Sequence, residues 1–136
     1  MAIARVREVG AFWIAVGFSR VNSFSNFSSL FSLTVPVAGL SSYFQLRGRD
    51  CNLVYAAKDG QGQPSQAFRT LVLQEFLARG ILAPSFVVGA AHDPAAIQQT
   101  IDAVAELMPV YQRALEDGVE TVLRGRPVRP TIRRRG

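Results

Sequence analysis

Residues 51–80 read CNLVYAAKDGQGQPSQAFRTLVLQEFLARG, and this stretch decides the fold because a strand, a loop and a helix follow one another in it. Residues 51–56 are mostly apolar and include residue types that favour strands, so they predict a strand. Two glycines and a proline within residues 58–64 predict a loop that ends this strand. Residues 65–79 then show helical spacing, and Gly80 stands where helices commonly end in the left-handed conformation.

The helix predicted for residues 65–79 has a clear start and one apolar face. Ser65 is a favourable N-cap, because its hydroxyl can accept a hydrogen bond from a free backbone N–H group of the first turn. Apolar residues then recur every three or four positions, which predicts one buried stripe. The stripe consists of Phe68, Val72 and Phe76, widened by Leu73 and Leu77.

The neighbouring segments add two strands. Residues 43–47 predict a strand that is antiparallel to residues 51–56, with a turn at residues 48–50. Residues 85–88 predict a third, buried strand after the first helix.

A long second helix follows Asp93, which is a good N-cap, and Pro94 suits the first helical position. We expect Pro109 to bend this helix and Gly118 to weaken it before it ends at Leu123. Its apolar face consists of Ile97, Ile101, Val104, Met108, Tyr111, Leu115 and Val122.

The order strand, strand, helix, strand, long helix predicts an α+β fold, in which a small, mostly antiparallel sheet carries two helices on one face. We expect apolar residues on both faces of this sheet, and therefore a partner layer from elsewhere on the open face. One face would hold Leu53, Tyr55 and Val87, and the other Cys51, Val54 and Val88.

Composition limits the class of protein. Apolar residues make up 49% and charged residues 18% of the chain, which is typical of a globular domain and not of a disordered one. The single cysteine excludes an internal disulfide, and with the single histidine it cannot form a four-ligand zinc site. We therefore expect a reducing, cytoplasmic location. No stretch has the roughly 18 consecutive apolar residues that a membrane span needs.

The net charge of +5 comes from the C-terminal tail. Six of the 15 basic residues lie in residues 124–136, where there is no acidic residue, so residues 1–123 carry nine basic and ten acidic residues. The tail also contains two prolines and no aromatic residue that could stack on bases. We expect an extended, solvated tail packed along a parent enzyme, and consider nucleic-acid binding the less favoured alternative.

Residues 1–37 differ from the rest of the chain, and no acidic residue lies between Glu8 and Asp50. We expect them to be an N-terminal extension without a stable fold. A secretory signal is the alternative, but the apolar run at residues 11–18 is short and no small-x-small cleavage site follows it. The expected organisation is therefore an extension at 1–37, a domain at 38–123 and an Arg/Pro-rich tail at 124–136.

Several short segments, taken in order, carry a family resemblance. They are CNLVY at 51–55, PSQAFRTL at 64–71, LQE at 73–75, RGILAPS at 79–85, AH at 91–92, YQRALEDG at 111–118 and GRPV at 125–128. Together they resemble the small C-terminal domain of class III pyridoxal-phosphate-dependent aminotransferases, in the branch of glutamate-1-semialdehyde aminomutase. The resemblance covers about residues 38–136 and leaves residues 1–37 unmatched.

This resemblance implies a fold type I enzyme that is usually a homodimer, with pyridoxal phosphate held as a Schiff base on a lysine of a larger domain. Only the C-terminal domain, which closes over the substrate, is matched here. The resemblance places Ala83, Pro84 and Ser85 nearest the substrate. Relatives that act on ω-amino acids have a carboxylate-binding arginine where Ile81 stands, and aminomutases have a glutamate after the Ala-Pro-Ser step that residues 86–89 lack.

The residues themselves offer no strong catalytic motif. Lys58 is the only lysine, but it lies in a Gly-rich polar loop beside Asp59, whereas a Schiff-base lysine needs a buried setting. The Gly60-x-Gly62 spacing lacks the third glycine and the Lys-Ser/Thr of a phosphate loop, so a strand-to-helix turn is favoured.

Two further candidates have structural explanations. His92 beside Asp93 could form an acid–base pair, but Asp93 is expected to cap the helix. Cys51 is expected to be a small apolar strand residue, with a reactive thiolate near Arg47 and Arg49 as the alternative. We therefore assign no catalytic, cofactor-binding or metal-binding residue to this chain.

Three functions stay open at this point. The first is a fragment of a class III aminotransferase-like protein, inactive alone, which pairs with a separate large domain or with a homodimer partner. The second is a non-catalytic interaction module that uses the open sheet face. The third, less favoured, is nucleic-acid binding through the tail.

Overall fold

The computed structural model describes residues 38–49, 52–89 and 91–129, and the predicted order of elements is confirmed within them. The elements are β1 (Phe44–Arg49), β2 (Asn52–Ala57), α3 (Gln66–Ala78), β3 (Phe86–Val87), α4 (Pro94–Asp117) and a short 3-10 helix (Val119–Thr121). Residues 1–37, which we expect to be an extension without a stable fold, lie outside the described residues.

The three strands form one antiparallel sheet in the order β1-β2-β3. Gly48 and Arg49 extend β1 and pair with Leu53 and Asn52, so they do not form the turn that the sequence predicts for them. Gly48 has φ of +124°, and a Cβ atom there would collide with the carbonyl group of Asn52. Glycine is therefore required at this position of the hairpin.

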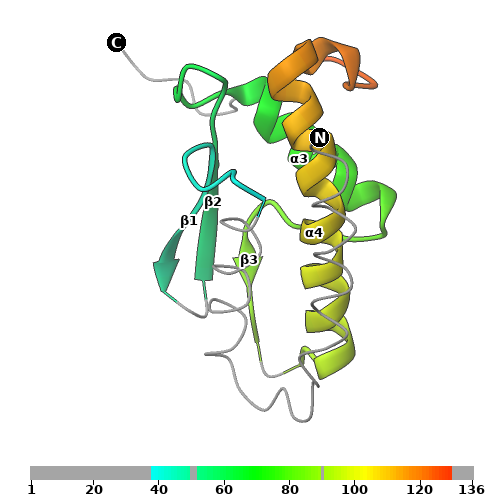
Figure 1. Cartoon of the computed structure of the whole chain (residues 1–136). Coiled ribbons are helices and arrows are strands. Elements are labelled where there is room, and N and C mark those ends of the chain that lie inside the picture. Colours follow the sequence, from blue (N-terminus) through cyan, green and yellow to red (C-terminus); the bar gives the residue numbers. More distant parts are fainter. Residues whose placement is uncertain (1–37, 50–51, 90, 130–136) are drawn as a thin grey trace.

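Both helices lie on the same side of the sheet, which confirms the α+β architecture (Figure 1). The side chains on this side of the strands are buried, among them Phe44, Tyr55 and Phe86. Their rings form one aromatic cluster, in which the Tyr55 ring lies 5.7 Å from those of Phe44 and Phe86 and 6.4 Å from that of Phe76, between ring centroids. The cluster joins α3 to all three strands and forms the centre of the core.

The ends of α3 follow the sequence signals. Ser65 is the N-cap, and its hydroxyl accepts a hydrogen bond from the Phe68 N–H group at 3.4 Å. At the other end Gly80 has φ of +74°, its N–H donates to the Leu77 carbonyl, and the Ile81 N–H donates to the Phe76 carbonyl. This is the pair of bonds expected where a glycine terminates a helix.

The N-cap of α4 is confirmed, but its C-terminus lies earlier than expected. The Asp93 side chain accepts a hydrogen bond from the Ala96 N–H group at 2.8 Å, and Pro94 occupies the first turn. The helix continues through Pro109 and ends at Asp117, because Gly118 adopts φ of +93°. The last residues of the predicted helix instead form the 3-10 turn, in which Val119 is buried.

Two apolar positions differ from the sequence prediction. Leu77 is 56% exposed, and the buried stripe of α3 includes Leu71 in its place. Val87 does not share a face with Leu53, because it is Phe86 that pairs with Leu53 and is buried beside it. Successive strand residues point to opposite faces, so Val87 lies on the open face, where it is 60% exposed and Val54 is 46% exposed.

The third strand ends sooner than predicted. Val88 follows β3 and is partly buried against the core, not placed on the open face with Val54. No helix within the described ranges is both long and apolar enough to cross a lipid bilayer.

A buried hydroxyl joins α4 to the sheet. The Tyr111 side chain is fully buried, and its hydroxyl donates to the Lys58 carbonyl at 2.6 Å and accepts from the Lys58 N–H at 2.9 Å. The same hydroxyl lies 3.2 Å from the Tyr43 carbonyl. It therefore binds the backbone just before β1 and just after β2, at the edge of the core. Burial raises the pKa of Tyr111 well above its ordinary value, so the hydroxyl keeps its proton.

We predict that Tyr111→Phe lowers the free energy of unfolding by about 1–2 kcal/mol, because the Lys58 carbonyl loses its donor in a buried setting. Tyr43→Phe is the matched control, since the Tyr43 hydroxyl makes no hydrogen bond within the described residues and the ring is kept. The control is expected to change stability by less than about 0.5 kcal/mol. Urea unfolding followed by circular dichroism measures both, and equal losses in the two variants would contradict the assignment.

Candidate functional site

The Ala83-Pro84-Ser85 segment connects α3 to β3, and two side chains from different elements hold its backbone. The hydroxyl of Tyr55, from β2, donates to the Ala83 carbonyl at 3.2 Å. The guanidinium Nη2 of Arg69, from the first turns of α3, donates to the Pro84 carbonyl at 3.1 Å. Ala83 is buried, Pro84 is exposed and Ser85 is half-buried, so the segment passes from the core to the surface within three residues.

Arg69 and Tyr55 also contact each other. The guanidinium carbon of Arg69 lies 5.2 Å from the centroid of the Tyr55 ring, which is the geometry of a cation–π contact. Burial raises the pKa of the Tyr55 hydroxyl, and the positive charge of Arg69 acts in the opposite direction. Each side chain thus limits the freedom of the other, and both are fixed beside Ala83-Pro84-Ser85. The sequence gives no sign of this pairing, because residues 55 and 69 lie in different elements.

The residues on either side of this segment are apolar. Ile81 is partly buried and packs against the core, and its N–H group completes the end of α3. Phe86 is 4% exposed and belongs to the aromatic cluster. Neither side chain can bind an anion. The polar side chains that contact this segment are those of Tyr55 and Arg69, from β2 and α3.

The loop at residues 58–64 is closed by its own carboxylate. The Oδ1 atom of Asp59 accepts hydrogen bonds from the N–H groups of Gln61 and Gln63, at 3.0 and 2.9 Å. These amides cannot then bind a phosphate group, which agrees with a strand-to-helix turn at Gly60-x-Gly62. Lys58 is half-buried at the start of this loop, with both its backbone groups bonded to Tyr111.

His92 and Asp93 do not bond to each other. His92 Nδ1 accepts a hydrogen bond from the Gly89 N–H group at 3.0 Å, while Asp93 caps α4. Both residues are exposed, and each serves the local backbone. Cys51 lies outside the described residues. Within the described part of the chain, no group of three or more His, Cys, Asp or Glu side chains could hold a metal ion.

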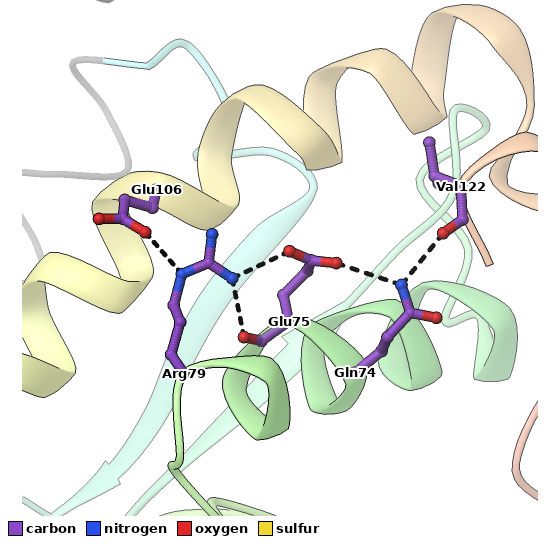
Figure 2. A network of polar contacts seen from close by, with 5 residues as sticks. All are labelled: Gln74, Glu75, Arg79, Glu106 and Val122. Atoms are coloured by element: carbon purple, nitrogen blue, oxygen red, sulfur yellow. Dashed lines mark hydrogen bonds and ion pairs between the residues drawn. The ribbon is translucent and has the colours of Figure 1, made fainter. Parts of the chain in front are cut away.

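A polar network that the sequence does not predict links α3, α4 and the C-terminal segment (Figure 2). Arg79 donates from Nε to Glu106 at 2.7 Å and from Nη1 to Glu75 at 2.9 Å. Gln74 donates from Nε2 to Glu75 at 3.1 Å and to the Val122 carbonyl at 3.0 Å. Glu75 is 8% exposed, so the network places a nearly buried carboxylate between a guanidinium and an amide.

Beside Arg79 lies a shallow groove of about 400 Å³ along the N-terminal half of α4. Its polar groups are bonded to one another: Glu106 pairs with Arg79, Gln98 donates to Asp102 at 2.8 Å, and Gln99 donates to the Arg79 carbonyl. The two bonds of Arg79 join the end of α3 to α4, and the three bonds together leave few groups of the groove to bind a ligand.

The chain after α4 is attached to α3. The Gln74 side-chain amide accepts from the Arg124 N–H at 2.7 Å as well as donating to Val122, and Thr70 Oγ1 accepts from the Val128 N–H at 2.8 Å. Residues 124–129 have no helix or strand, and Arg124, Arg126 and Arg129 are exposed. The described part of the tail is therefore held by its backbone, while its charges face solvent.

Comparison with known proteins gives no relative. No family model matches the chain, and neither a curated protein nor a solved structure is significantly similar to it. The family resemblance of the short segments therefore rests on the sequence alone, and the function it implies belongs to the proposal below.

We predict that Glu75→Gln destabilises the protein by about 1–2 kcal/mol at pH 7. Burial acts to raise the pKa of Glu75, but hydrogen bonds from Arg79 and Gln74 and the charges of Arg79 and Arg124 outweigh it, so the pKa is lowered from 4.5. A lowered pKa means that the ionised form stabilises the fold above pH 4.5, and that this contribution is lost as the pH falls through the lowered value.

The difference between wild type and Glu75→Gln should therefore shrink as the pH falls below 4.5, measured by urea unfolding from pH 7 to pH 3. Glu120→Gln is the control, because Glu120 is exposed and makes no hydrogen bond or ion pair in the described region. A difference that does not depend on pH would show that the charge of Glu75 contributes nothing.

Proposed function

We propose that this chain is the small, substrate-covering domain of a class III aminotransferase-like protein of the glutamate-1-semialdehyde aminomutase branch. The ordered sequence segments between residues 51 and 128 support the proposal. The antiparallel sheet with both helices on one face is compatible with such a domain. In this role the chain supplies a wall of the substrate site, and a separate large domain transfers the amino group with pyridoxal phosphate.

The observation that carries the proposal is the support given to Ala83-Pro84-Ser85. A wall of a substrate site must keep its shape, because misplacement by about 1 Å can reduce a rate about a hundredfold. Here the carbonyl groups of Ala83 and Pro84 are held by Tyr55 and Arg69, at 3.2 and 3.1 Å. The segment resembling the substrate-proximal part of the family is thus fixed by buried or half-buried side chains from two elements.

The residues of this chain do not fit the cofactor itself. Pyridoxal phosphate needs a lysine whose amine is sheltered and neutral when it attacks, and it is bound by further groups at its ring and its phosphate. Lys58, the only lysine, starts a polar loop, and the loop amides that might bind phosphate are bonded to Asp59. We therefore derive no step of the reaction on this chain, and we expect the isolated chain to be inactive.

The proposal implies a partner and a location. The partner is a separate cofactor domain or a second subunit of a homodimer, and the location is the cytoplasm, which suits a single unpaired cysteine. Nucleic-acid binding is not part of the proposal, because residues 124–129 offer arginines without an aromatic side chain to stack on bases.

One observation favours a second function, a non-catalytic interaction module. Val54 and Val87 are 46% and 60% exposed on the open face of the sheet, on neighbouring strands. Exposed valines on adjacent strands could be covered by another polypeptide. This function needs no cofactor, and light scattering with a variant of the open face tests it. A mass that rises with concentration in the wild type, and not in Val54→Ser, would support it.

The test of the proposed function uses pyridoxal phosphate and the full chain. We expect no stoichiometric Schiff-base absorbance when the two are mixed, and the same spectrum for Lys58→Ala, because Lys58 stands in a polar loop beside Asp59. A stoichiometric band in the wild type that Lys58→Ala abolishes would contradict the proposal, since this chain would then hold the cofactor.

The second half of the test supplies a separate cofactor domain to the chain. A class III cofactor domain, prepared without its own C-terminal domain, is mixed with the chain and assayed for transfer from an amino donor. We expect the mixture to be at least tenfold more active than either part, and Tyr55→Phe, which frees the Ala83 carbonyl, to reduce the gain. Activity of the chain by itself would overturn the proposal.

A further inference from the structure

Arg69 has an unusual combination of rigidity and unused hydrogen-bonding capacity. Its guanidinium group stacks on the Tyr55 ring at 5.2 Å, and Nη2 donates to the Pro84 carbonyl at 3.1 Å. A guanidinium has five N–H donors arranged as a planar fork, so this one bond leaves most of them available. The side chain is half-buried, and the proline whose carbonyl it binds is exposed.

The charge of Arg69 is not neutralised by the part of the chain that the structure describes. The ion pairs there join Arg79 to Glu75 and to Glu106, and no carboxylate lies within 4.0 Å of Arg69. This contrasts with Arg79, whose guanidinium contacts two carboxylates. A cation that is already fixed loses little conformational freedom when it binds, which makes it a favourable partner for an anion.

We propose that Arg69 is an anion-binding residue that takes a carboxylate group of a small molecule beside Ala83-Pro84-Ser85. The planar fork of a guanidinium matches the two oxygens of a carboxylate, and a bidentate pair would use donors that Pro84 does not occupy. That the carboxylate belongs to an amino-acid substrate rests on the proposed function. That Arg69 binds an anion rests on the contacts of this chain alone.

The opposing explanation is that Arg69 is only a structural brace. In that case its cation–π contact and its bond to Pro84 would be its whole role, and small anions would affect it no more than any surface arginine. Arg113 provides the comparison within the same molecule, because it is exposed on α4 and makes no hydrogen bond or ion pair within the described residues. The two explanations differ in whether the response of Arg69 saturates.

The experiment titrates the full chain with sodium acetate at constant ionic strength, and follows the Nε–H signals of Arg69 and Arg113 by nuclear magnetic resonance. We expect the Arg69 signal to shift with saturation and a dissociation constant on the order of 10 mM, as for one charge-assisted contact. The Arg113 signal should drift weakly without saturation. Equal, non-saturating drift of both signals would overturn the proposal.

Two further measurements test the choice of a carboxylate as the anion and the role of the Arg69 guanidinium group. In a parallel titration with inorganic phosphate, saturation by phosphate and not by acetate would overturn the choice of a carboxylate. Arg69→Lys keeps the charge without the planar fork, and should weaken acetate binding at least fivefold, measured at the Pro84-adjacent amide of Ser85. Unchanged binding in this variant, with its circular dichroism intact, would also overturn the proposal.

The outcome is distinguishable from that of the proposed function. Acetate binding at Arg69, together with a failure of the chain to activate any cofactor domain, would keep the anion site and remove the aminotransferase role. Activation of a cofactor domain without acetate binding at Arg69 would keep the aminotransferase role and remove the anion site. In an active mixture, Arg69→Gln should raise KM for the amino-acid substrate at least tenfold and leave the cofactor absorbance unchanged.

Discussion

A tyrosine whose ring is buried must still find a partner for its hydroxyl group, and this requirement organises the whole domain. Tyr55 and Tyr111 are 2% and 0% exposed, and each places its ring among the core aromatics. In the described part of the chain, each hydroxyl donates to a backbone carbonyl at the rim of the core. Tyr111 therefore fixes the loop that begins at Lys58, and Tyr55 fixes the segment at Ala83. The loop at Lys58 and the segment at Ala83 are thus fixed by the hydrogen bonds that the buried tyrosine hydroxyl groups require.

The elements with local signals could be predicted from the sequence. The N-caps Ser65 and Asp93 and the terminating Gly80 act on neighbouring backbone groups, so their effects are visible within a few residues. The position of β3 could be predicted, but the face of each of its residues could not, because two residues are too few for alternation to reveal which side chain faces the core. Its pairing with β2, which buries Phe86 and exposes Val87, depends on tertiary contacts.

The candidate site shows the same division between local and distant signals. The segment Ala83-Pro84-Ser85 was found through a family resemblance, whereas its support by Tyr55 and Arg69 joins residues that lie 28 and 15 positions away. The link between Arg79 and Glu106 spans 27 positions and has no counterpart in any pattern of spacing. Polar networks of this kind depend on how helices pack, whereas the periodicity of apolar residues predicts only which face of a helix is buried.

The side-chain amide of Gln74 binds the chain as a neighbouring strand would, accepting from the Arg124 N–H and donating to the Val122 carbonyl. With the bond from Val128 to Thr70, hydrogen bonds to α3 continue beyond the last helix as far as residue 128. A domain border drawn after Leu123 would remove two of these three bonds and leave the Gln74 carbonyl oxygen without its donor. Residues 124–128, which the sequence predicts to be part of a solvated tail, are therefore attached to α3 through their backbone.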